Sequence, residues 1–478
     1  MPNSKPTPTR PDFDAIVLGG GSAGYAAART LAAGGQRVAV IEGGAEVGGL
    51  CILRGCMPTK ALLYAAEVAH LTRHAATWGI SVPPPGVDFA AVMARKDAMV
   101  EEFAAYRRQQ LADGRFTFLR AMARFDGPNA VMLDDHRRLT AARFVVATGS
   151  RVATPSIPGL ADAGYLTSDD ALALTAPPES LIILGGGSIA CEFSQFFARM
   201  GTRVIQIQRG AQVLRAFDED IASAIGEALR KDGVDLHTGA RLLEAGRNGA
   251  TRWVRFESHG EIRRVEATHL LLALGRVPNT SSLHLAAAGV QVDGSGRILT
   301  NEEMRTSAPH IMAAGDCTSE NEVVHIAIQQ AEIAAHNLLY PDRPRRLDNR
   351  LAMSVVFTDP QAAMVGKTEK DCRLGNIRFA TASYPFADHG KSILMEAKIG
   401  RVKLLADPDT GLLLGGAVAG PSGGELIHEI VVAMAAQWTA RQLAATPHYH
   451  PSLAEIWTYP AEELAEATSR NEARPATP

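Results

Sequence analysis

The sequence predicts an α/β fold with an α+β region at its C-terminal end, and two observations carry this prediction. First, the segments 13–33 and 181–200 each read as a short apolar strand, a glycine-rich turn and the start of a helix. Units of this kind alternate strands with helices and build parallel sheets. Second, the glycine motifs stop after about residue 350, where strand-like runs are followed by a helical pattern at 424–438.

Length and composition are those of an ordinary globular protein. The chain has 478 residues, of which 46% are hydrophobic and 21% charged, and this excludes collagen-like, disordered and coiled-coil chains. At roughly 100–200 residues per domain, about three domains are expected. The formal net charge of -3 indicates no nucleic-acid partner. Five cysteines are too few for a secreted disulfide scaffold.

We expect neither an export signal nor a membrane span. The N-terminal segment has no apolar stretch of the kind that signal peptides carry, and no run of about 18 apolar residues predicts a transmembrane helix. The cytoplasm is therefore the simplest compartment. Residues 1–11 are rich in Pro, Ser and Thr, and we expect them and residues 470–478 to be disordered tails.

The two glycine turns have the spacing and the context of dinucleotide-binding motifs, because each follows a strand and opens a helix. The first small residue allows a tight turn, the second lets backbone N–H groups approach a pyrophosphate, and the third lets the helix pack close to the strand. The helix N-terminus then favours negative charge. The three positions are Gly19, Gly21 and Gly24 in the first unit, and Gly185, Gly187 and Ala190 in the second.

The strand after each turn indicates which nucleotide is bound. Glu42 and Gln208 each lie 23 residues after the first glycine of their own turn, so the two units are in register. An acid at this position accepts hydrogen bonds from a free ribose, whereas an arginine accommodates a 2′-phosphate. The second unit lacks the acid and carries Arg209 and Arg215, which favours NADP(H). Gln208 could still bind a free ribose, and both arginines could simply be solvated.

A cysteine pair, Cys51 and Cys56, follows the first unit at the start of a helix. In a regular helix their Cα atoms would lie about 8.6 Å apart, whereas a disulfide needs roughly 4.4–6.8 Å. A disulfide therefore requires a distorted segment, for which Gly55 supplies the freedom. Lys60 and the helix N-terminus would stabilise a Cys56 thiolate. Zinc is disfavoured because no second Cys/His cluster lies nearby, while two unrelated buried thiols remain an alternative to a redox pair.

Together these motifs resemble those of the flavin-dependent pyridine nucleotide–disulfide oxidoreductases, a family that includes dihydrolipoamide dehydrogenase, glutathione reductase and mercuric reductase. The resemblance runs from Asp12 to Ala467 in the family's order. It rests also on three further segments, which are Ala147-Thr148-Gly149, Ala314-Gly315-Asp316 and His450-Pro451-Ser452 with Glu455. It implies two Rossmann-like domains, which bind FAD and NAD(P), and a C-terminal α+β dimerisation domain. The implied boundaries are 12–154 with 284–350 for FAD, 155–283 for NAD(P) and 351–469 for dimerisation.

The resemblance also implies a role for each motif residue. Glu42 would bind the adenosine ribose of FAD, and Asp316 would bind its ribityl chain. Lys60 would lie near the flavin and pair with Glu192. The remaining implied positions are Gly19, Gly21, Gly24, Gly49, Thr148 and Gly149 for FAD, and Gly185, Gly187, Ala190, Gln208, Arg209, Arg215 and Gly275 for NAD(P). No metal ligands are expected.

The implied catalytic groups are two thiols and a histidine. Cys56 would face the flavin as the charge-transfer thiol, and Cys51 would be the interchange thiol that attacks substrate. His450 would be the general acid–base, oriented by Glu455, because an imidazole ordinarily titrates near neutrality; His448 is the weaker candidate. In this family the histidine comes from the other subunit, so a homodimer is implied.

Three hypotheses follow for the function, and the first two differ in the substrate. The favoured one is a lipoamide-like dithiol or disulfide, free or on a lipoylated carrier protein, because segments 325–327 and 424–429 resemble dihydrolipoamide dehydrogenase. The second is another disulfide or a metal ion, although the chain lacks the C-terminal cysteine pair of mercuric reductase. Arg54 lies beside the cysteines in sequence. It either indicates an anionic substrate or is an ordinary solvated arginine. The third is a flavin-binding electron-transfer protein with a vestigial disulfide.

Overall fold

A computed structural model describes residues 10–318 and 321–472, and in it the chain forms two compact units. Each unit gathers three separate stretches of sequence. Unit 1 consists of the described residues of Met1–Pro58, Lys96–Ala153 and Arg276–Asp348, and unit 2 of those of Thr59–Arg95, Thr154–Gly275 and Asn349–Pro478.

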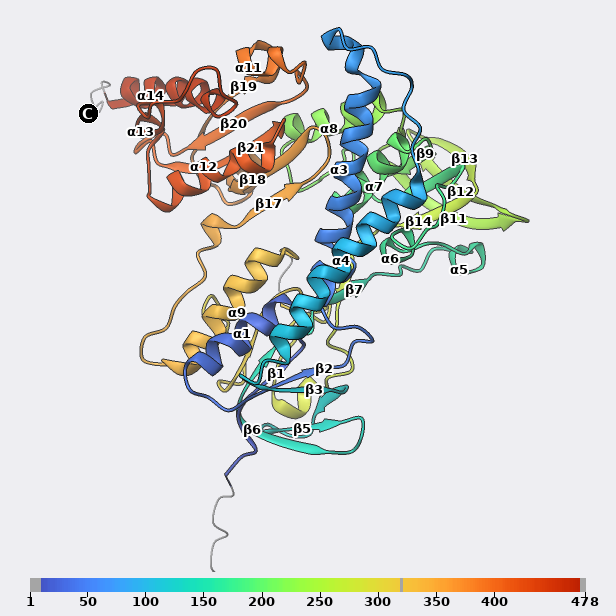
Figure 1. The fold of residues 1–478 in the computed structure, drawn as a ribbon. Coiled ribbons are helices and arrows are strands. Elements are labelled where there is room, and N and C mark those ends of the chain that lie inside the picture. The colour runs from blue at the N-terminus through green and yellow to red at the C-terminus, as the bar shows by residue number, and fades with distance from the viewer. Residues whose placement is uncertain (1–9, 319–320, 473–478) are drawn as a thin grey trace, which may run out of the picture. The chain divides into compact units, whose positions relative to one another are not determined.

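Unit 1 is built on a seven-stranded sheet with the order β3-β2-β1-β6-β5-β4, in which β16 also pairs with β6 (Figure 1). Strands β1, β2, β3, β6 and β16 pair in parallel, whereas β4 and β5 form an antiparallel meander with β6. Strands buried on both faces of a parallel sheet read as continuous apolar runs. This explains β1, in which Ala15, Ile16 and Val17 are 0% exposed. The elements of unit 1 are β1 (Phe13–Leu18), α1 (Ser22–Ala33), β2 (Val38–Glu42), α2 (Gly49–Leu53), β3 (Thr117–Arg120), β4 (Ala123–Phe125), β5 (Ala130–Leu133), β6 (Arg138–Val146), β7 (Ser150–Val152), β15 (Arg276–Pro278), η2 (Leu285–Ala288), β16 (Ile311–Ala313) and α9 (Val324–Leu339).

Helices α1 and α9 lie side by side over one face of this sheet (Figure 1). The alanines of α1 make this possible, because small side chains let two helix backbones approach closely; Ala27 and Ala28 are 0% exposed. They share one hydrophobic core with Ala331 and Ala334 of α9. The sheet thus carries the first glycine turn at the end of β1 and presents it at the N-terminus of α1.

Unit 2 holds a second parallel sheet, with the order β10-β9-β8-β14, and a separate antiparallel sheet, β11-β12-β13. Its core contains the aromatic side chains of α7 together with residues of α3, α4 and α8. The elements in this part are α3 (Cys56–Arg73), η1 (Ala75–Trp78), α4 (Phe89–Leu111), α5 (Leu160–Ala163), α6 (Ser168–Ala171), β8 (Ser180–Leu184), α7 (Ser188–Arg199), β9 (Arg203–Ile207), α8 (Glu219–Lys231), β10 (Asp235–His237), β11 (Ala240–Asn248), β12 (Thr251–Ser258), β13 (Glu261–Ala267) and β14 (His269–Leu272). Helices α3 and α4 each begin in one unit and end in the other.

The C-terminal part of unit 2 is a five-stranded antiparallel sheet with the order β17-β18-β21-β20-β19. Helix α12 packs on β18 and β21, and α14 packs on β19 and β20. Trp457 and Ile427 are 0% exposed at the centre of its core. The elements are η3 (Asn349–Leu351), β17 (Met353–Val356), β18 (Gln361–Gly366), α10 (Glu369–Leu374), β19 (Ala380–Pro385), η4 (Phe386–Asp388), α11 (Gly390–Leu394), β20 (Arg401–Ala406), β21 (Leu413–Gly420), α12 (Gly423–Ala435), α13 (Ala440–Ala444), η5 (Ala454–Trp457) and α14 (Thr458–Glu472).

The structure confirms the fold class that the sequence predicts, with two parallel-sheet units and a C-terminal α+β region. One boundary differs. Helix α14 continues to Glu472, beyond the start of the expected tail at residue 470, because Ala461 and Leu464 anchor it in the core. The rest of the two expected tails lies almost wholly outside the described residues.

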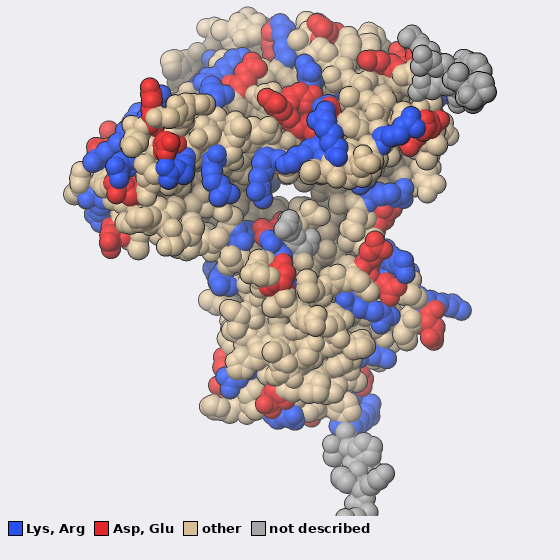
Figure 2. Space-filling view, turned by 180° about the vertical axis from the view of Figure 1, so that it is seen from behind, with Lys and Arg blue, Asp and Glu red and all other residues tan. Residues whose placement is uncertain are grey.

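Within the described chain, no helix is both long and apolar enough to cross a membrane. Basic and acidic side chains are interspersed over the face that Figure 2 presents.

Candidate active site

Two positions of the first glycine motif, Gly19 and Gly24, accept only glycine. Gly19 has a φ of +105°, and a Cβ added to it would lie 2.3 Å from the carbonyl oxygen of Ala147. A Cβ added to Gly24 would lie 1.8 Å from the carbonyl oxygen of Gly19. A Cβ on Gly49, the first residue of α2, would lie 2.6 Å from the Cα of Gly21. The turn therefore brings bare backbone to the N-terminus of α1, which is the arrangement that binds a pyrophosphate.

Glu42, at the end of β2, reaches back to this turn. Its Oε2 accepts a hydrogen bond from the N–H of Gly20 (2.7 Å), and its Oε1 accepts one from the N–H of Gly44 (2.6 Å). Each carboxylate oxygen can accept a second hydrogen bond, so Glu42 keeps acceptor capacity for ribose hydroxyls. The turn and Glu42 together fit the adenosine and pyrophosphate parts of a dinucleotide.

A second polar group of unit 1 lies where β6 and β16 end side by side. Asp316 follows β16, and its Oδ2 accepts a hydrogen bond from Ser150 Oγ (2.6 Å). Arg276 Nε in turn donates to Ser150 Oγ (2.8 Å). Thr148 and Gly149 precede Ser150, and Gly149 has a φ of +68°. The carboxyl ends of neighbouring parallel strands meet at one edge of a sheet, which is where α/β folds bind their ligands.

The cysteine segment is not one continuous helix. Helix α2 ends at Leu53, the backbone of Arg54 leaves the helical region (φ −143°, ψ 13°), and α3 begins at Cys56. A Cβ added to Gly55 would lie 3.2 Å from the Cα of Cys51. Gly55 therefore lets the chain double back against Cys51. The segment between the two half-buried cysteines is thus distorted from a regular helix.

Two arginines stand near this segment in unit 1. Arg54 forms an exposed ion pair with Glu46, so its charge is shared with a carboxylate. Arg107 of α4 lies over the ring of Tyr25 at 4.3 Å. Burial lowers the pKa of Arg107, and the attraction of Tyr25 and Cys51 opposes this change. A guanidinium within electrostatic reach of Cys51 favours its thiolate.

Lys60 lies one turn after Cys56 on α3 and is held inside unit 2. Its Nζ lies 2.9 Å from Oε2 and 3.1 Å from Oε1 of Glu192 on α7. The Glu192 side chain is only 3% exposed, and its Oε1 also accepts the backbone N–H of Phe357 (2.9 Å). The Lys60 ammonium lies over the Phe357 ring at 4.6 Å from its centre. A carboxylate and an aromatic face thus hold the lysine, and the Phe357 N–H in turn holds the carboxylate.

The second glycine turn repeats the first. Gly185 has a φ of +131°, and a Cβ added to it would lie 2.2 Å from the carbonyl oxygen of Ala273. A Cβ on Gly187 would meet no atom within 4 Å, so space remains open above the turn. Ala190 is 0% exposed where α7 packs on the sheet. Gly275, with a φ of +113°, follows β14. This turn fits the pyrophosphate of a nicotinamide nucleotide.

The polar residues that follow β9 differ from the glutamate at the end of β2. Gln208 Nε2 donates to the carbonyl oxygen of Gln212 (3.2 Å), which keeps this side chain within its own loop. Arg209 and Arg215 are exposed. Across residues 10–318 and 321–472, neither arginine has a carboxylate partner in an ion pair. Both guanidinium groups are therefore open to an anionic ligand such as a phosphate.

His450 is paired and still accessible. Its Nδ1 lies 2.9 Å from Oε2 of Glu455, while its side chain is 79% exposed. The Glu455 side chain is 11% exposed. His448 is different, because its Nε2 contacts Glu429 (2.6 Å), its Nδ1 contacts the carbonyl oxygen of Thr446 (2.8 Å), and its side chain is 8% exposed. His450 is therefore the histidine that can exchange a proton with a ligand.

The structure also shows contacts that the sequence analysis missed. Phe357, Arg107 and a buried histidine, His389, which lies 3.4 Å from Glu455, come close to expected site residues. No local pattern marks any of them, because each reaches its partner across many residues of sequence. Within the described residues, no group of three or more His, Cys, Asp or Glu side chains could hold a metal ion.

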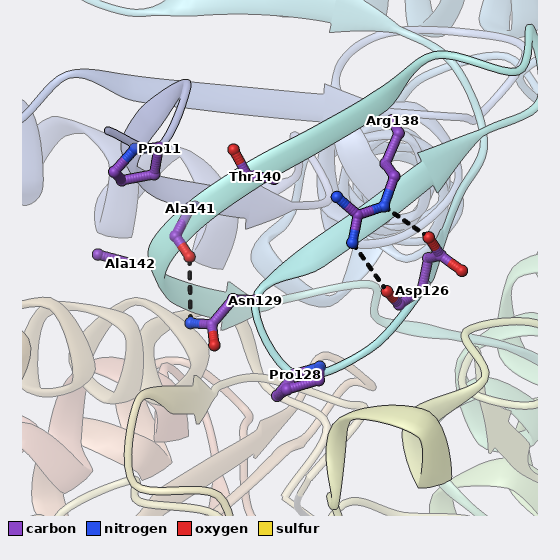
Figure 3. A pocket seen from close by; sticks show the side chains of 8 residues that line it. All are labelled: Pro11, Asp126, Pro128, Asn129, Arg138, Thr140, Ala141 and Ala142. Carbon is purple, nitrogen blue, oxygen red and sulfur yellow. Dashed lines mark hydrogen bonds and ion pairs between the residues drawn. The ribbon is translucent and has the colours of Figure 1, made fainter. Parts of the chain in front are cut away.

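A hollow of about 430 Å³ lies at the surface of unit 1, and Figure 3 shows the residues that line it. Its polar side chains have partners within the same segment, since Arg138 Nε lies 2.7 Å from Asp126 and Asn129 Nδ2 donates to the backbone carbonyl oxygen of Ala141 (3.3 Å). The lining residues are Pro11, Asp126, Pro128, Asn129, Arg138, Thr140, Ala141 and Ala142. Since none of the expected site residues lines it, we assign this hollow no function.

Comparison with known proteins gives matches to one family along almost the whole chain. The pyridine nucleotide-disulphide oxidoreductase family matches residues 13–331, and its dimerisation domain matches residues 352–461. The chain is 33% identical to dihydrolipoyl dehydrogenase of Haemophilus influenzae over 446 residues, which are 92% of either protein. It is 32% identical to mercuric reductase of Staphylococcus aureus over 424 residues, 88% of this chain and 77% of that one. Among solved structures, the HOCl-induced flavoprotein disulfide reductase RclA from Escherichia coli has a TM-score of 0.83 and 28% identity, with 94% of this chain and 99% of that chain covered.

Two family matches thus cover both the glycine-turn region and the C-terminal antiparallel sheet. The identities and coverages do not separate dihydrolipoyl dehydrogenase from mercuric reductase as the nearer type. The chain belongs to the pyridine nucleotide-disulphide oxidoreductase family, whose members use FAD and a nicotinamide nucleotide, and it carries that family's dimerisation domain.

Proposed function

We propose that this protein moves electrons between NAD(P)H and a dithiol or disulfide through a redox-active Cys51–Cys56 pair. The observation that carries the proposal is the contact of His450 Nδ1 with the buried Glu455 carboxylate at 2.9 Å. Thiol–disulfide exchange needs a group that gives and takes a proton near neutral pH, and an accessible imidazole held by a carboxylate is such a group. Reduction of a metal ion protonates no leaving thiolate, so the pair favours a sulfur substrate.

The first glycine turn, Glu42 and Asp316 would hold FAD, which supplies electron transfer between the nicotinamide and the cysteine pair when it is bound. The second glycine turn would hold the nucleotide. Lys60, fixed by Glu192, would place a positive charge beside the flavin ring. We also propose that residues 12–154 with 284–350 bind FAD, that residues 155–283 bind NAD(P) and that residues 351–469 mediate dimerisation. The cytoplasmic location remains a prediction.

The thiol chemistry balances without any further reactant. In the reducing direction, the Cys51 thiolate attacks one sulfur of the substrate disulfide and forms a mixed disulfide, and His450 gives its proton to the thiolate that leaves. The Cys56 thiolate then attacks the sulfur of Cys51, releases the second substrate sulfur as a thiolate and closes the Cys51–Cys56 disulfide. Two protein thiols are oxidised and one substrate disulfide is reduced. We propose that His450 serves the cysteines of a second subunit in a homodimer.

The proposed substrate is lipoamide-like, either a small dithiol or a lipoylated carrier protein. The resemblance of segments 325–327 and 424–429 to dihydrolipoamide dehydrogenase and the contact of His450 with Glu455 support it. The second candidate is an NADPH-dependent reductase of another disulfide. The unpaired, exposed Arg209 and Arg215, in place of an acid at the end of β9, favour it. We propose NADP(H) as the preferred nucleotide on the same observation.

The test is steady-state turnover by the purified flavin-loaded protein. Dihydrolipoamide would be offered with NAD and with NADP, and glutathione disulfide with NADH and with NADPH. Turnover of dihydrolipoamide supports the lipoamide assignment, whereas turnover of glutathione disulfide alone supports the second candidate. Cys51→Ser abolishes both reactions, and unchanged turnover in this variant would refute the proposed function.

The nucleotide preference has its own test. Arg209→Ala and Arg215→Ala should each raise the KM for NADPH by about 10- to 150-fold, because a charge-assisted bond to phosphate contributes about 1.5–3 kcal/mol. The KM for NADH is the matched control and should stay unchanged. A wild-type preference for NADH, or an equal rise of both KM values, contradicts the NADP(H) assignment.

A further inference from the structure

The carboxylate of Glu455 lies between two histidines. Its Oε2 contacts His450 Nδ1 at 2.9 Å, and its Oε1 lies 3.4 Å from the Nε2 of His389. His389 follows η4 and is 0% exposed. Its Nε2 has no hydrogen bond of ordinary geometry to any described residue, and 3.4 Å exceeds the usual N–H···O distance. A buried ring nitrogen thus lies beside the carboxylate that contacts the proposed acid–base group.

The surroundings of His389 define its protonation. Its Nδ1 lies 2.8 Å from the hydroxyl of Ser392 on α11, which is also 0% exposed. The groups that face the ring are Glu455, His450, the backbone carbonyl of Ser452, and Phe386, whose ring meets it edge-on. Burial lowers the pKa of His389, although Glu455 and the Ser452 carbonyl oppose this change. The ring is therefore neutral at neutral pH.

A neutral ring with its proton on Nε2 satisfies both neighbours. A serine hydroxyl can donate as well as accept, so Ser392 donates to Nδ1 and the Nε2–H is directed at Glu455 Oε1. The opposite tautomer would set a lone pair of Nε2 against a carboxylate oxygen inside the protein, which is unfavourable. The order of donors and acceptors then runs from Ser392 through His389 to Glu455, and its last contact, at 3.4 Å, is longer than an ordinary hydrogen bond.

We propose that His389 is a positioning residue, whose Nε2–H holds Glu455 Oε1 and thereby keeps Oε2 directed at His450 Nδ1. The inference rests on the proposed role of His450 as the acid–base group. The Nε2–H of His389 also attracts the negative charge of Glu455, so that the carboxylate acts less strongly on His450. Loss of the inner donor should leave the full charge to act on His450 and make its proton harder to remove.

The rate at which diethylpyrocarbonate modifies the His450 imidazole tests this proposal without any substrate. The reagent modifies the neutral ring, and mass spectrometry of the peptide that contains His450 gives the rate at each pH. In His389→Met, the midpoint of this pH profile should rise by about half a pH unit or more. In His389→Gln, whose amide keeps a donor near the same place, it should stay at the wild-type value. Flavin absorbance and the thermal midpoint of the holoprotein control for folding.

Two further variants keep the inference falsifiable. Ser392→Ala removes the donor to Nδ1 and should move the midpoint in the same direction, even if His389→Met does not fold. In a Glu455→Gln background, His389→Met should add no shift, because its effect passes through the carboxylate. An unmoved midpoint in both His389→Met and Ser392→Ala, or an equal shift in His389→Gln, would overturn the inference. The midpoint is readable whether or not the protein turns over a disulfide, so this result is distinct from the test of the proposed function.

Discussion

The ion pair between Lys60 and Glu192 allows a quantitative test of the structure. In Glu192→Gln the side chain keeps its shape, and the amide oxygen can still accept the N–H of Phe357. The variant loses the negative charge opposite the Lys60 ammonium. In Glu192→Leu the acceptor for Phe357 is lost as well. The two variants therefore separate the charge of Glu192 from its hydrogen bonding.

The magnitude follows from burial. Removing one partner of a buried ion pair costs about 3–5 kcal/mol, but the Lys60 side chain is 31% exposed, and it keeps the Phe357 ring at 4.6 Å. Water and the ring thus compensate part of the loss, and we expect about 1–3 kcal/mol for Glu192→Gln. Glu192→Leu should cost about 1 kcal/mol more, because a partly buried N–H loses its acceptor.

The assay is thermal unfolding of the flavin-loaded protein, followed by circular dichroism and by flavin release. The thermal midpoint should fall by about 2–6 °C in Glu192→Gln and further in Glu192→Leu. Lys60→Met combined with Glu192→Leu should cost less than the sum of the single variants, since no unpaired charge remains buried. A midpoint of Glu192→Gln within about one degree of wild type, or strict additivity in the double variant, would refute the reasoning.

Three more outcomes are expected. Gly24→Ala places a Cβ 1.8 Å from a carbonyl oxygen, so the purified variant should lack flavin absorbance, whereas Gly187→Ala meets no atom within 4 Å and should keep its flavin while its KM for nucleotide rises. Burial raises the pKa of Cys191 to about 12 and that of Cys317 to about 11, so iodoacetamide should label neither in the folded protein at about pH 8 and both after unfolding; labelling of the native protein contradicts their burial. Because burial lowers the pKa of His389 below its ordinary 6.5, the unfolded chain binds this proton more tightly, and the free energy of unfolding should fall as the pH drops through 6.5. Thermal midpoints between about pH 5 and pH 8 should show a shallower fall in His389→Gln than in wild type, and identical slopes would contradict a neutral buried ring.

Local sequence determined the parts of this protein that depend on backbone conformation and on short periodic patterns. Gly19 and Gly24 mark the first turn because a side chain at either position would collide with a carbonyl oxygen a few ångströms away. Glu42 could be placed at the turn because one strand–turn–helix unit has a nearly constant length. The break between Cys51 and Cys56 was expected only if the two form a disulfide, and Gly55 permits it. The family and the fold class were therefore predictable from these residues, and both are confirmed.

The tertiary structure decided which side chains meet across long separations. Lys60 and Glu192 lie 132 residues apart in sequence, and their pairing was expected only through the family resemblance. Phe357 follows an ordinary apolar strand, and His389 lies in a loop with no motif around it. Their contacts with Glu192 and Glu455 arise because the sheets of unit 2 bring distant segments into one core. A buried charge or ring nitrogen takes its partner from whatever the packing places beside it, and this choice leaves no periodic signal in the sequence.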